Sequence, residues 1–213
     1  MGLRQKTISA LLWSTVERVG NQGIVFLVTL ILARILVPED FGLIGILMVF
    51  VRVSEALINN GFGQAIIQKK SVTDNDLMTT FVLSVGASLI LYLILFVSAP
   101  FVADFYNEPL LFRLLQVMGF VIVLDAFVVI QRVQFEKNLD FKTISKATVS
   151  SSIVGGLGAL LCAIIGFGVW SLVCMMVLQK IVLAVMLWLH SSWKPRGAVS
   201  RESFIWNIVA LAT

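Results

Sequence analysis

The sequence predicts an all-α polytopic membrane protein with six transmembrane helices and the start of a seventh. Hydrophobic residues make up 59% of the 213 residues and charged residues only 13%, whereas soluble domains are about a quarter charged. The apolar residues also fall into long runs, each close to the roughly 20 residues that cross a hydrocarbon core as a helix. Helices suit these runs because a helix satisfies its own backbone hydrogen bonds where no water is present.

Six apolar runs follow one another, separated by short turn-forming or polar segments. They cover residues 8–36, 41–58, 77–99, 110–130, 144–165 and 169–189. All four prolines are expected to lie between the helices, where a residue without an amide donor does least harm. Gly166-Phe167-Gly168 separates the last two runs and predicts a tight turn, so these two helices should be neighbours.

The first run carries Glu17, Arg18, Asn21 and Gln22 near its middle. A charge at this depth costs roughly 2.5 to 3.5 kcal/mol, so it is expected to face a protein interior or a hydrated cavity. Arg18, Asn21 and Gln22 share a helical face at spacings of three and four, whereas Glu17 is predicted to point elsewhere. We expect Arg18, Asn21 and Gln22 to be substrate-binding residues.

The second run places Arg52 three residues before Glu55, at a depth similar to that of Arg18. Two arginines that project into one cavity could recognise phosphate together, because each guanidinium offers several donors in a plane. The alternative is an ion-pair lock without a ligand, in which either Glu17 or Glu55 neutralises Arg52. The sequence leaves both interpretations open.

The later runs add charges and small residues. Asp125 and Lys180, in the fourth and sixth runs, form either a proton or cation relay or a buried pair, and we favour the pair. In the fifth run, small residues recur at intervals of four and predict close helix packing without ligand contact. These are Ser151, Gly155, Ala159 and Ala163, with Ser152 and Gly156 beside them.

Two loops have predicted structural roles. Residues 71–74 are expected to cap the third helix. Residues 132–146 mix charged and apolar side chains and are predicted to form an interfacial amphipathic link on anionic lipid. Loop Lys and Arg residues concentrate on one side, with only Arg34 and Arg113 on the other, so the N-terminus is predicted to be cytoplasmic.

Other function classes are disfavoured. The net charge is +4, but the basic residues alternate between loops and form no continuous stripe for nucleic acid. Cys162 and Cys174 lie within apolar runs and indicate no disulfide framework, and the sequence holds no Cys and His cluster and no phosphate loop. We therefore expect no enzyme activity, no metal, no cofactor and no nucleic-acid partner.

Two segments carry a family resemblance. They are Leu-Ala-Arg-Ile-Leu-Val-Pro-Glu-Asp-Phe-Gly at residues 32–42 and Asn-Gly-Phe-Gly-Gln-Ala-Ile-Ile-Gln at residues 60–68. Both resemble the bacterial polysaccharide-transporter family, which includes O-antigen, colanic-acid and teichuronic-acid exporters and belongs to the superfamily of multidrug and oligosaccharidyl-lipid exporters. The resemblance implies a transporter of two six-helix lobes. Residues 1–200 would then be the N-terminal lobe and residues 201–213 the start of a truncated seventh helix, as in a fragment.

The resemblance also implies the function of the whole protein. Such flippases move an undecaprenyl-diphosphate-linked oligosaccharide across the bacterial inner membrane by alternating access, with membrane lipids and the polysaccharide polymerase machinery as further partners. No family motif assigns Arg18 or Arg52, so their expected roles rest on depth and charge. A first alternative is a cation-coupled small-molecule or drug extruder that titrates Glu17, Glu55 or Asp125. A second alternative is a nontransporting membrane scaffold, which would be packed without a polar cleft.

Overall fold

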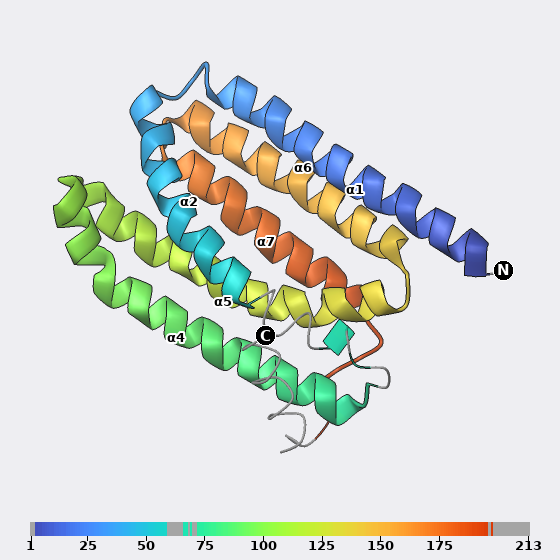
Figure 1. The fold of residues 1–213 in the computed structure, drawn as a ribbon. Coiled ribbons are helices and arrows are strands. Elements are labelled where there is room, and N and C mark those ends of the chain that lie inside the picture. Colours follow the sequence, from blue (N-terminus) through green and yellow to red (C-terminus); the bar gives the residue numbers. More distant parts are fainter. Residues whose placement is uncertain (1–2, 59–65, 68, 70–71, 196, 198–213) are drawn as a thin grey trace. The chain divides into compact units, whose positions relative to one another are not determined.

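The computed structural model describes residues 3–58, 66–67, 69, 72–195 and 197. Within these residues the long elements are all helices, as Figure 1 shows, and this confirms the predicted all-α class. They are α1 (Leu3–Leu32), α2 (Pro38–Ile58), α4 (Asp74–Tyr106), α5 (Pro109–Lys137), α6 (Phe141–Ile165) and α7 (Trp170–His190). The predicted start of a seventh spanning helix, at residues 201–213, lies outside the described residues.

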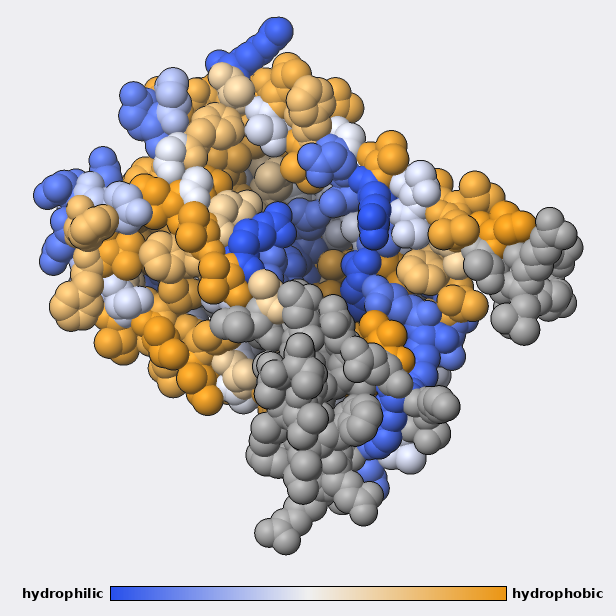
Figure 2. Space-filling view, in the orientation of Figure 1, coloured by the Kyte–Doolittle hydropathy of each residue, from blue (hydrophilic) through white to orange (hydrophobic). Residues whose placement is uncertain are grey.

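Within the described residues, five helices are long and apolar enough to cross a membrane, namely α1, α4, α5, α6 and α7. Hydrophobic residues cover much of the face drawn in Figure 2, which suits a surface that meets lipid. The protein is therefore an all-α polytopic membrane protein. The sequence predicted a sixth span at α2, which carries Glu39, Asp40, Arg52 and Glu55 within its 21 residues. That α2 also spans the membrane stays a prediction.

The chain divides into two compact units. The first unit contains Met1–Leu47 and Phe135–His190, and the second contains Met48–Gln134 and Ser191–Thr213. In the first unit, α6 packs against both α1 and α7 and lies between them, as Figure 1 shows. Their shared apolar core is formed by Val28, Leu32, Leu36, Ala159, Ala163 and Leu172.

The predicted small-residue stripe of α6 explains how closely these helices approach. Gly155 lies so near α7 that a Cβ atom there would be 2.7 Å from the backbone oxygen of Met175. Gly166 ends α6 in the left-handed conformation, with φ +91°, which glycine adopts at no steric cost. The predicted tight turn and the predicted contact between the last two helices are both confirmed.

In the second unit, α4 and α5 pack through an aromatic contact and a glycine contact. The rings of Phe81 and Phe127 meet edge to face, with centroids 5.5 Å apart. Gly119 accommodates the ring of Tyr92, because a Cβ atom at this position would lie 2.6 Å from Tyr92 Cδ2. The second unit is thus built on close side-chain contact between these two helices.

Thr73 caps α4, as the sequence predicted. The backbone N–H of Asp76 donates to Thr73 Oγ1 at 3.3 Å, and the backbone N–H of Thr73 donates to Asp76 Oδ2 at 2.9 Å. This reciprocal pair satisfies donors that a helix start otherwise leaves open. Lys69 Nζ lies 2.6 Å from Asp76 Oδ1 and further fixes the carboxylate.

Replacing Thr73 by alanine is expected to destabilise the protein by about 1 kcal/mol, because one capping hydrogen bond is lost. The midpoint of thermal unfolding of the purified protein measures the effect. Thr73→Ser keeps the hydroxyl group and is the matched control, so it should unfold near the wild-type temperature. Equal stability of Thr73→Ala and wild type would contradict the capping role.

Two features of the helix boundaries differ from the prediction. The first run was expected to reach residue 36, but α1 ends at Leu32 and residues 33–36 form turns. The ring of Pro38 biases the residue directly before it, Val37, away from helix. Pro100 was expected between helices but lies inside α4, which continues to Tyr106. Membrane helices tolerate proline where neighbouring groups satisfy the freed backbone.

Residues 132–146 do not form the separate link that the sequence predicted, whereas the contact of this region with anionic lipid stays a prediction. α5 runs to Lys137, a short connection follows, and α6 begins at Phe141 with Asp140 as its N-cap. Asp140 Oδ1 accepts from the backbone N–H of Thr143 at 3.2 Å, so a cap replaces the expected separate segment. Lys142 Nζ lies 5.9 Å from the centre of the Trp13 ring, a cation–π contact that joins the start of α6 to α1.

Candidate functional site

The polar residues in the middle of α1 separate onto two faces. Glu17 is buried, with 6% of its surface exposed, and Asn21 is partly buried, whereas Arg18 and Gln22 are exposed. The sequence grouped Asn21 with Arg18, but the structure places Asn21 with Glu17. Residues four apart differ by only about 40° around a helix of 3.6 residues per turn, and residues three apart differ by about 60°. Glu17 and Asn21, which are four residues apart, therefore share one face, and Arg18 and Gln22 share the other.

Glu17 and Asn21 face α6 and α7. Thr148 Oγ1 donates to Glu17 Oε1 at 3.2 Å. One turn along, Asn21 Oδ1 accepts hydrogen bonds from Ser152 Oγ and from Gln179 Nε2, the latter at 3.0 Å. Gln179 Nε2 also lies 2.9 Å from Ser152 Oγ. We call these five residues the α1–α6–α7 polar cluster.

The small residues of α6 make this cluster possible. Thr148 and Ser152 are separated by four residues, so they occupy one face of α6, and Gly155 and Gly156 follow them towards the helix end. Because the glycines let the three backbones approach closely, short hydroxyl side chains reach across to α1 and α7. Sequence reasoning treated Ser152 only as a packing residue and missed Thr148 and Gln179. The signal was present, since Gln179 is an uncharged polar residue within a long apolar run.

Arg18 and Gln22 present a polar face away from this cluster. Arg18 lies 15 residues after Leu3, about 22 Å along α1 at ~1.5 Å per residue, and thus near the middle of the 30-residue helix. An exposed guanidinium at this depth needs water or a polar partner, because it cannot reach either membrane surface at low cost. That Arg18 and Gln22 face a hydrated cavity stays a prediction.

Arg52 and Glu55 form an ion pair within α2. Arg52 Nη1 lies 3.1 Å from Glu55 Oε2, and the side chains are 72% and 13% exposed, respectively. Most of the guanidinium is therefore accessible in spite of the pair. Arg18 belongs to the first unit and Arg52 to the second, so their projection into one cavity stays a prediction, as does a pair between Glu17 and Arg52.

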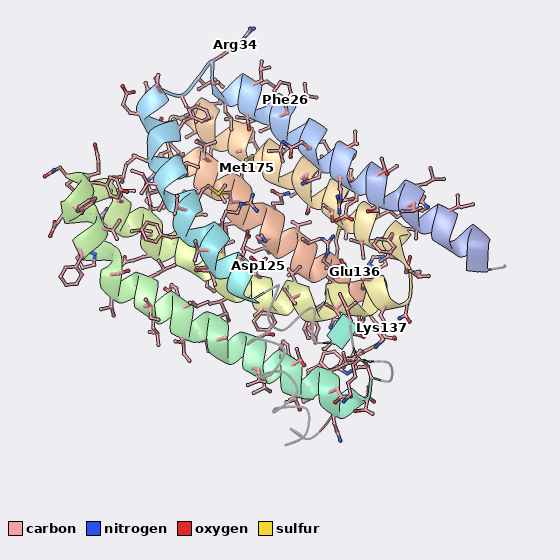
Figure 3. All side chains as sticks on the ribbon, viewed as in Figure 1. Phe26, Arg34, Asp125, Glu136, Lys137 and Met175 are labelled. Carbon is pink, nitrogen blue, oxygen red and sulfur yellow. The ribbon has the colours of Figure 1, made fainter. Side chains whose placement is uncertain are left out.

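Asp125 and Lys180 also belong to different units. Asp125, labelled on α5 in Figure 3, is 2% exposed, and Lys180 on α7 is partly buried. The contact between them that the sequence favoured therefore stays a prediction. A pocket of about 530 Å³ lies in the second unit among other residues: Asp74, Leu77, Gln134, Ser192, Trp193 and Lys194.

The chain is similar to known proteins over much of its length. A family model described as polysaccharide biosynthesis protein matches residues 31–208. The chain is 28% identical over 187 residues to the lipopolysaccharide biosynthesis protein WzxC of Escherichia coli K12, covering 85% of this chain and 36% of that protein. It is 27% identical over 196 residues to the succinoglycan biosynthesis transport protein ExoT of Rhizobium meliloti, covering 89% and 38%.

A third relative is the teichuronic acid biosynthesis protein TuaB of Bacillus subtilis, 27% identical over 101 residues, which cover 47% of this chain and 21% of that protein. No solved structure matches the chain. The chain spans well under half the length of these relatives.

Proposed function

The chain belongs to the polysaccharide biosynthesis protein family, and on this premise we propose that it forms part of a flippase for a lipid-linked oligosaccharide. The substrate would be an undecaprenyl-diphosphate-linked oligosaccharide, carried across the bacterial inner membrane by alternating access. The observation that carries the proposal is the exposed Arg18, which lies mid-helix in a chain whose relatives are named for polysaccharide biosynthesis and transport. A cationic group at this depth suits an anionic headgroup that must cross an apolar core.

Arg18, Gln22 and Arg52 are the substrate-binding residues in this proposal. The exposed guanidinium groups would bind the diphosphate through charge-assisted hydrogen bonds, and the Gln22 amide would bind phosphate or sugar oxygens. Asn21 would act differently from the original expectation, because its Oδ1 already accepts two hydrogen bonds inside the polar cluster. It would hold α1 in position and so direct Arg18 and Gln22 towards the substrate.

The remaining charges would orient or neutralise these groups. Glu55 would fix the position of Arg52 through their 3.1 Å contact. Asp125 and Lys180 would form a buried pair, since intramembrane charges commonly pair with one another. Glu17 would belong to the polar cluster and not to the substrate-binding face.

The headgroup would move while the lipid tail stays in the bilayer. A polar cavity lowers the cost of carrying sugar hydroxyls and diphosphate through hydrocarbon, and rocking of one lobe against another would expose that cavity to each side in turn. The loop Lys and Arg residues other than Arg34 and Arg113 would lie on the cytoplasmic side with the N-terminus. The polysaccharide polymerase machinery would receive the product at the outer leaflet.

A cation-coupled extruder is the second candidate, because Arg52 is already paired with a carboxylate. A transporter of cations would keep its arginines neutralised and use a buried acid such as Glu17 or Asp125. Arg18, exposed on the other face of α1, favours the anionic substrate. The two functions predict different phenotypes in cells.

Deleting the gene from its own bacterium tests the proposal. We expect the deletion to abolish the surface polymer and to cause the lipid-linked precursor to accumulate on the cytoplasmic leaflet. The full-length gene should reverse both effects. Sensitivity to cationic drugs is measured in the same strains as the control for an extruder. Normal polymer with altered drug sensitivity would reject the flippase and support the second candidate.

A further inference from the structure

The two cysteines of the chain lie in the two helices of the α6–α7 hairpin, near its turn. Cys162 is four residues before Gly166, which ends α6, and Cys174 is four residues after Trp170, which begins α7. At ~1.5 Å per residue, each cysteine is about 6 Å from its end of the helix. The sequence indicated no disulfide framework, because both cysteines fall within apolar runs, but the hairpin brings these two residues together.

The two thiols are in direct contact. Cys162 and Cys174 are free thiols, and their side chains form a hydrogen bond with each other. Gly158 makes room for this contact, because a Cβ atom there would lie 3.8 Å from Cys174 Sγ. Cys162 follows Gly158 by four residues and thus occupies the same face of α6 one turn further along. The Cys174 sulfur therefore lies against α6, next to a second thiol.

The close packing of α6 on α7 suits a covalent bond between these cysteines. A disulfide requires Cβ atoms about 3.5–4.5 Å apart, which two helices allow only where their backbones approach closely. They do so at Gly155, where a Cβ atom would lie 2.7 Å from Met175 O. Rotation of two thiols that already touch would bring the sulfur atoms to the bonding distance of about 2.0 Å.

We propose that Cys162 and Cys174 are a disulfide site, which an external disulfide oxidises from the outer face of the membrane. One cysteine, as its thiolate, attacks a sulfur of the external disulfide and displaces one thiol. The second cysteine then attacks the resulting mixed disulfide and displaces the other thiol. Two S–H bonds are broken and one S–S bond is formed, while the external disulfide takes up two electrons and two protons and leaves as two thiols.

The charges that flank the hairpin favour the outer face. Lys142 and Lys146 lie at the start of α6 and Lys194 follows α7, whereas the turn at residues 166–168 contains no Lys or Arg. Because Lys and Arg concentrate on the cytoplasmic side, the turn lies on the opposite side. This step rests on the orientation that belongs to the proposed function, whereas the contact between the thiols does not. Disulfides form and persist in oxidising outer compartments and are rare in the cytosol.

The disulfide ties α7 to α6 at the outer end of the hairpin. Both cysteines are partly exposed, so an external disulfide can reach them. Gln179 lies five residues beyond Cys174 on α7 and hydrogen-bonds to Ser152 on α6. A covalent bond at the cysteines therefore restrains the same two helices that this hydrogen bond joins.

Mass spectrometry of one tryptic peptide tests the proposal. Residues 147–180 form a single peptide that contains both cysteines, because no Lys or Arg lies between Lys146 and Lys180. The full-length protein in lipid nanodiscs is treated with oxidised glutathione, and the remaining thiols are blocked with N-ethylmaleimide. We expect a peptide that is lighter by two hydrogen atoms and carries no maleimide. It should exceed the glutathione-carrying peptide at least about tenfold, because the second thiol is held beside the first.

Leu161→Cys combined with Cys162→Ser is the matched control. This variant keeps two cysteines in the same peptide but moves one sulfur to position 161, where the side chain is 63% exposed on another face of α6. It should carry glutathione or maleimide in place of the internal disulfide. A control that forms the disulfide as readily as the wild type overturns the proposal, and so does a wild-type peptide that carries only maleimide or glutathione.

Intact cells test the oxidation in its own compartment. The deletion strain that carries the full-length gene is quenched with acid, its thiols are blocked with N-ethylmaleimide, and the same peptide is measured. We expect the disulfide form in untreated cells and two maleimide groups after dithiothreitol. A fully reduced peptide in untreated cells overturns the proposal. Neither experiment measures polymer export, so the disulfide site and the flippase can fail separately.

Discussion

Replacing Arg18 by alanine is expected to lower surface polymer export at least about tenfold. A charge-assisted hydrogen bond to an anionic group is worth about 1.5–3 kcal/mol, and each 1.4 kcal/mol corresponds to a tenfold change. The effect should be larger if the guanidinium makes two hydrogen bonds to the diphosphate in an environment of low polarity. The measurement is polymer per cell in the gene-deletion strain that carries the variant, at matched abundance of the protein in the membrane.

Two variants make the Arg18 result specific. Arg34→Ala removes an arginine from the connection after α1, where Figure 3 shows this side chain pointing away from the helices, and export should be unchanged. Arg18→Lys keeps the charge but loses the planar set of donors, so an intermediate loss is expected. Undiminished export by Arg18→Ala would reject its role in substrate binding.

Arg52 and Glu55 allow the two interpretations of their ion pair to be separated. If Arg52 binds the substrate, Arg52→Ala should reduce export strongly, whereas Glu55→Gln should reduce it much less. If the pair is only a lock within α2, the two variants should lose export equally, because each removes the same 3.1 Å contact. Export is compared in the same strain, with membrane abundance as the control for folding.

Replacing Gly155 by alanine is expected to destabilise the first unit by about 1–3 kcal/mol, the range for overpacking a close contact. The added Cβ would lie 2.7 Å from Met175 O and 3.2 Å from Gln179 N, both backbone atoms of α7. Since backbone cannot rotate away as a side chain end can, α6 and α7 must separate. The separation would also draw Gln179 away from Ser152. Thermal unfolding and membrane abundance of the full-length protein measure the loss.

Gly23→Ala is the matched control for this substitution. Gly23 lies inside α1, and a Cβ atom there would have nothing within 4 Å. Alanine at such a position removes the conformational freedom of glycine from the unfolded chain and should leave stability unchanged or slightly raised. Equal destabilisation at both positions would show that helix contact at Gly155 is not the cause.

The sequence by itself determined the fold class and the local helix signals. Runs of apolar residues near the length of a membrane span left helices as the reasonable structure, and the family resemblance predicted from residues 32–42 and 60–68 is confirmed. Thr73 and Gly166 were recognisable as a cap and a turn because their roles depend only on neighbouring residues. The small-residue stripe of α6 likewise predicted close packing, although not which helices it would meet.

The tertiary structure alone decided which polar residues meet. Glu17 and Thr148 are 131 residues apart in sequence, as are Asn21 and Ser152, and no local pattern can pair positions so distant. Spacing along α1 left the direction of Asn21 ambiguous, because it lies within about 60° of Arg18 and about 40° of Glu17. Packing resolved the ambiguity. The glycines of α6 let α1 and α7 approach closely, and Asn21 faces this contact because it can form hydrogen bonds across it.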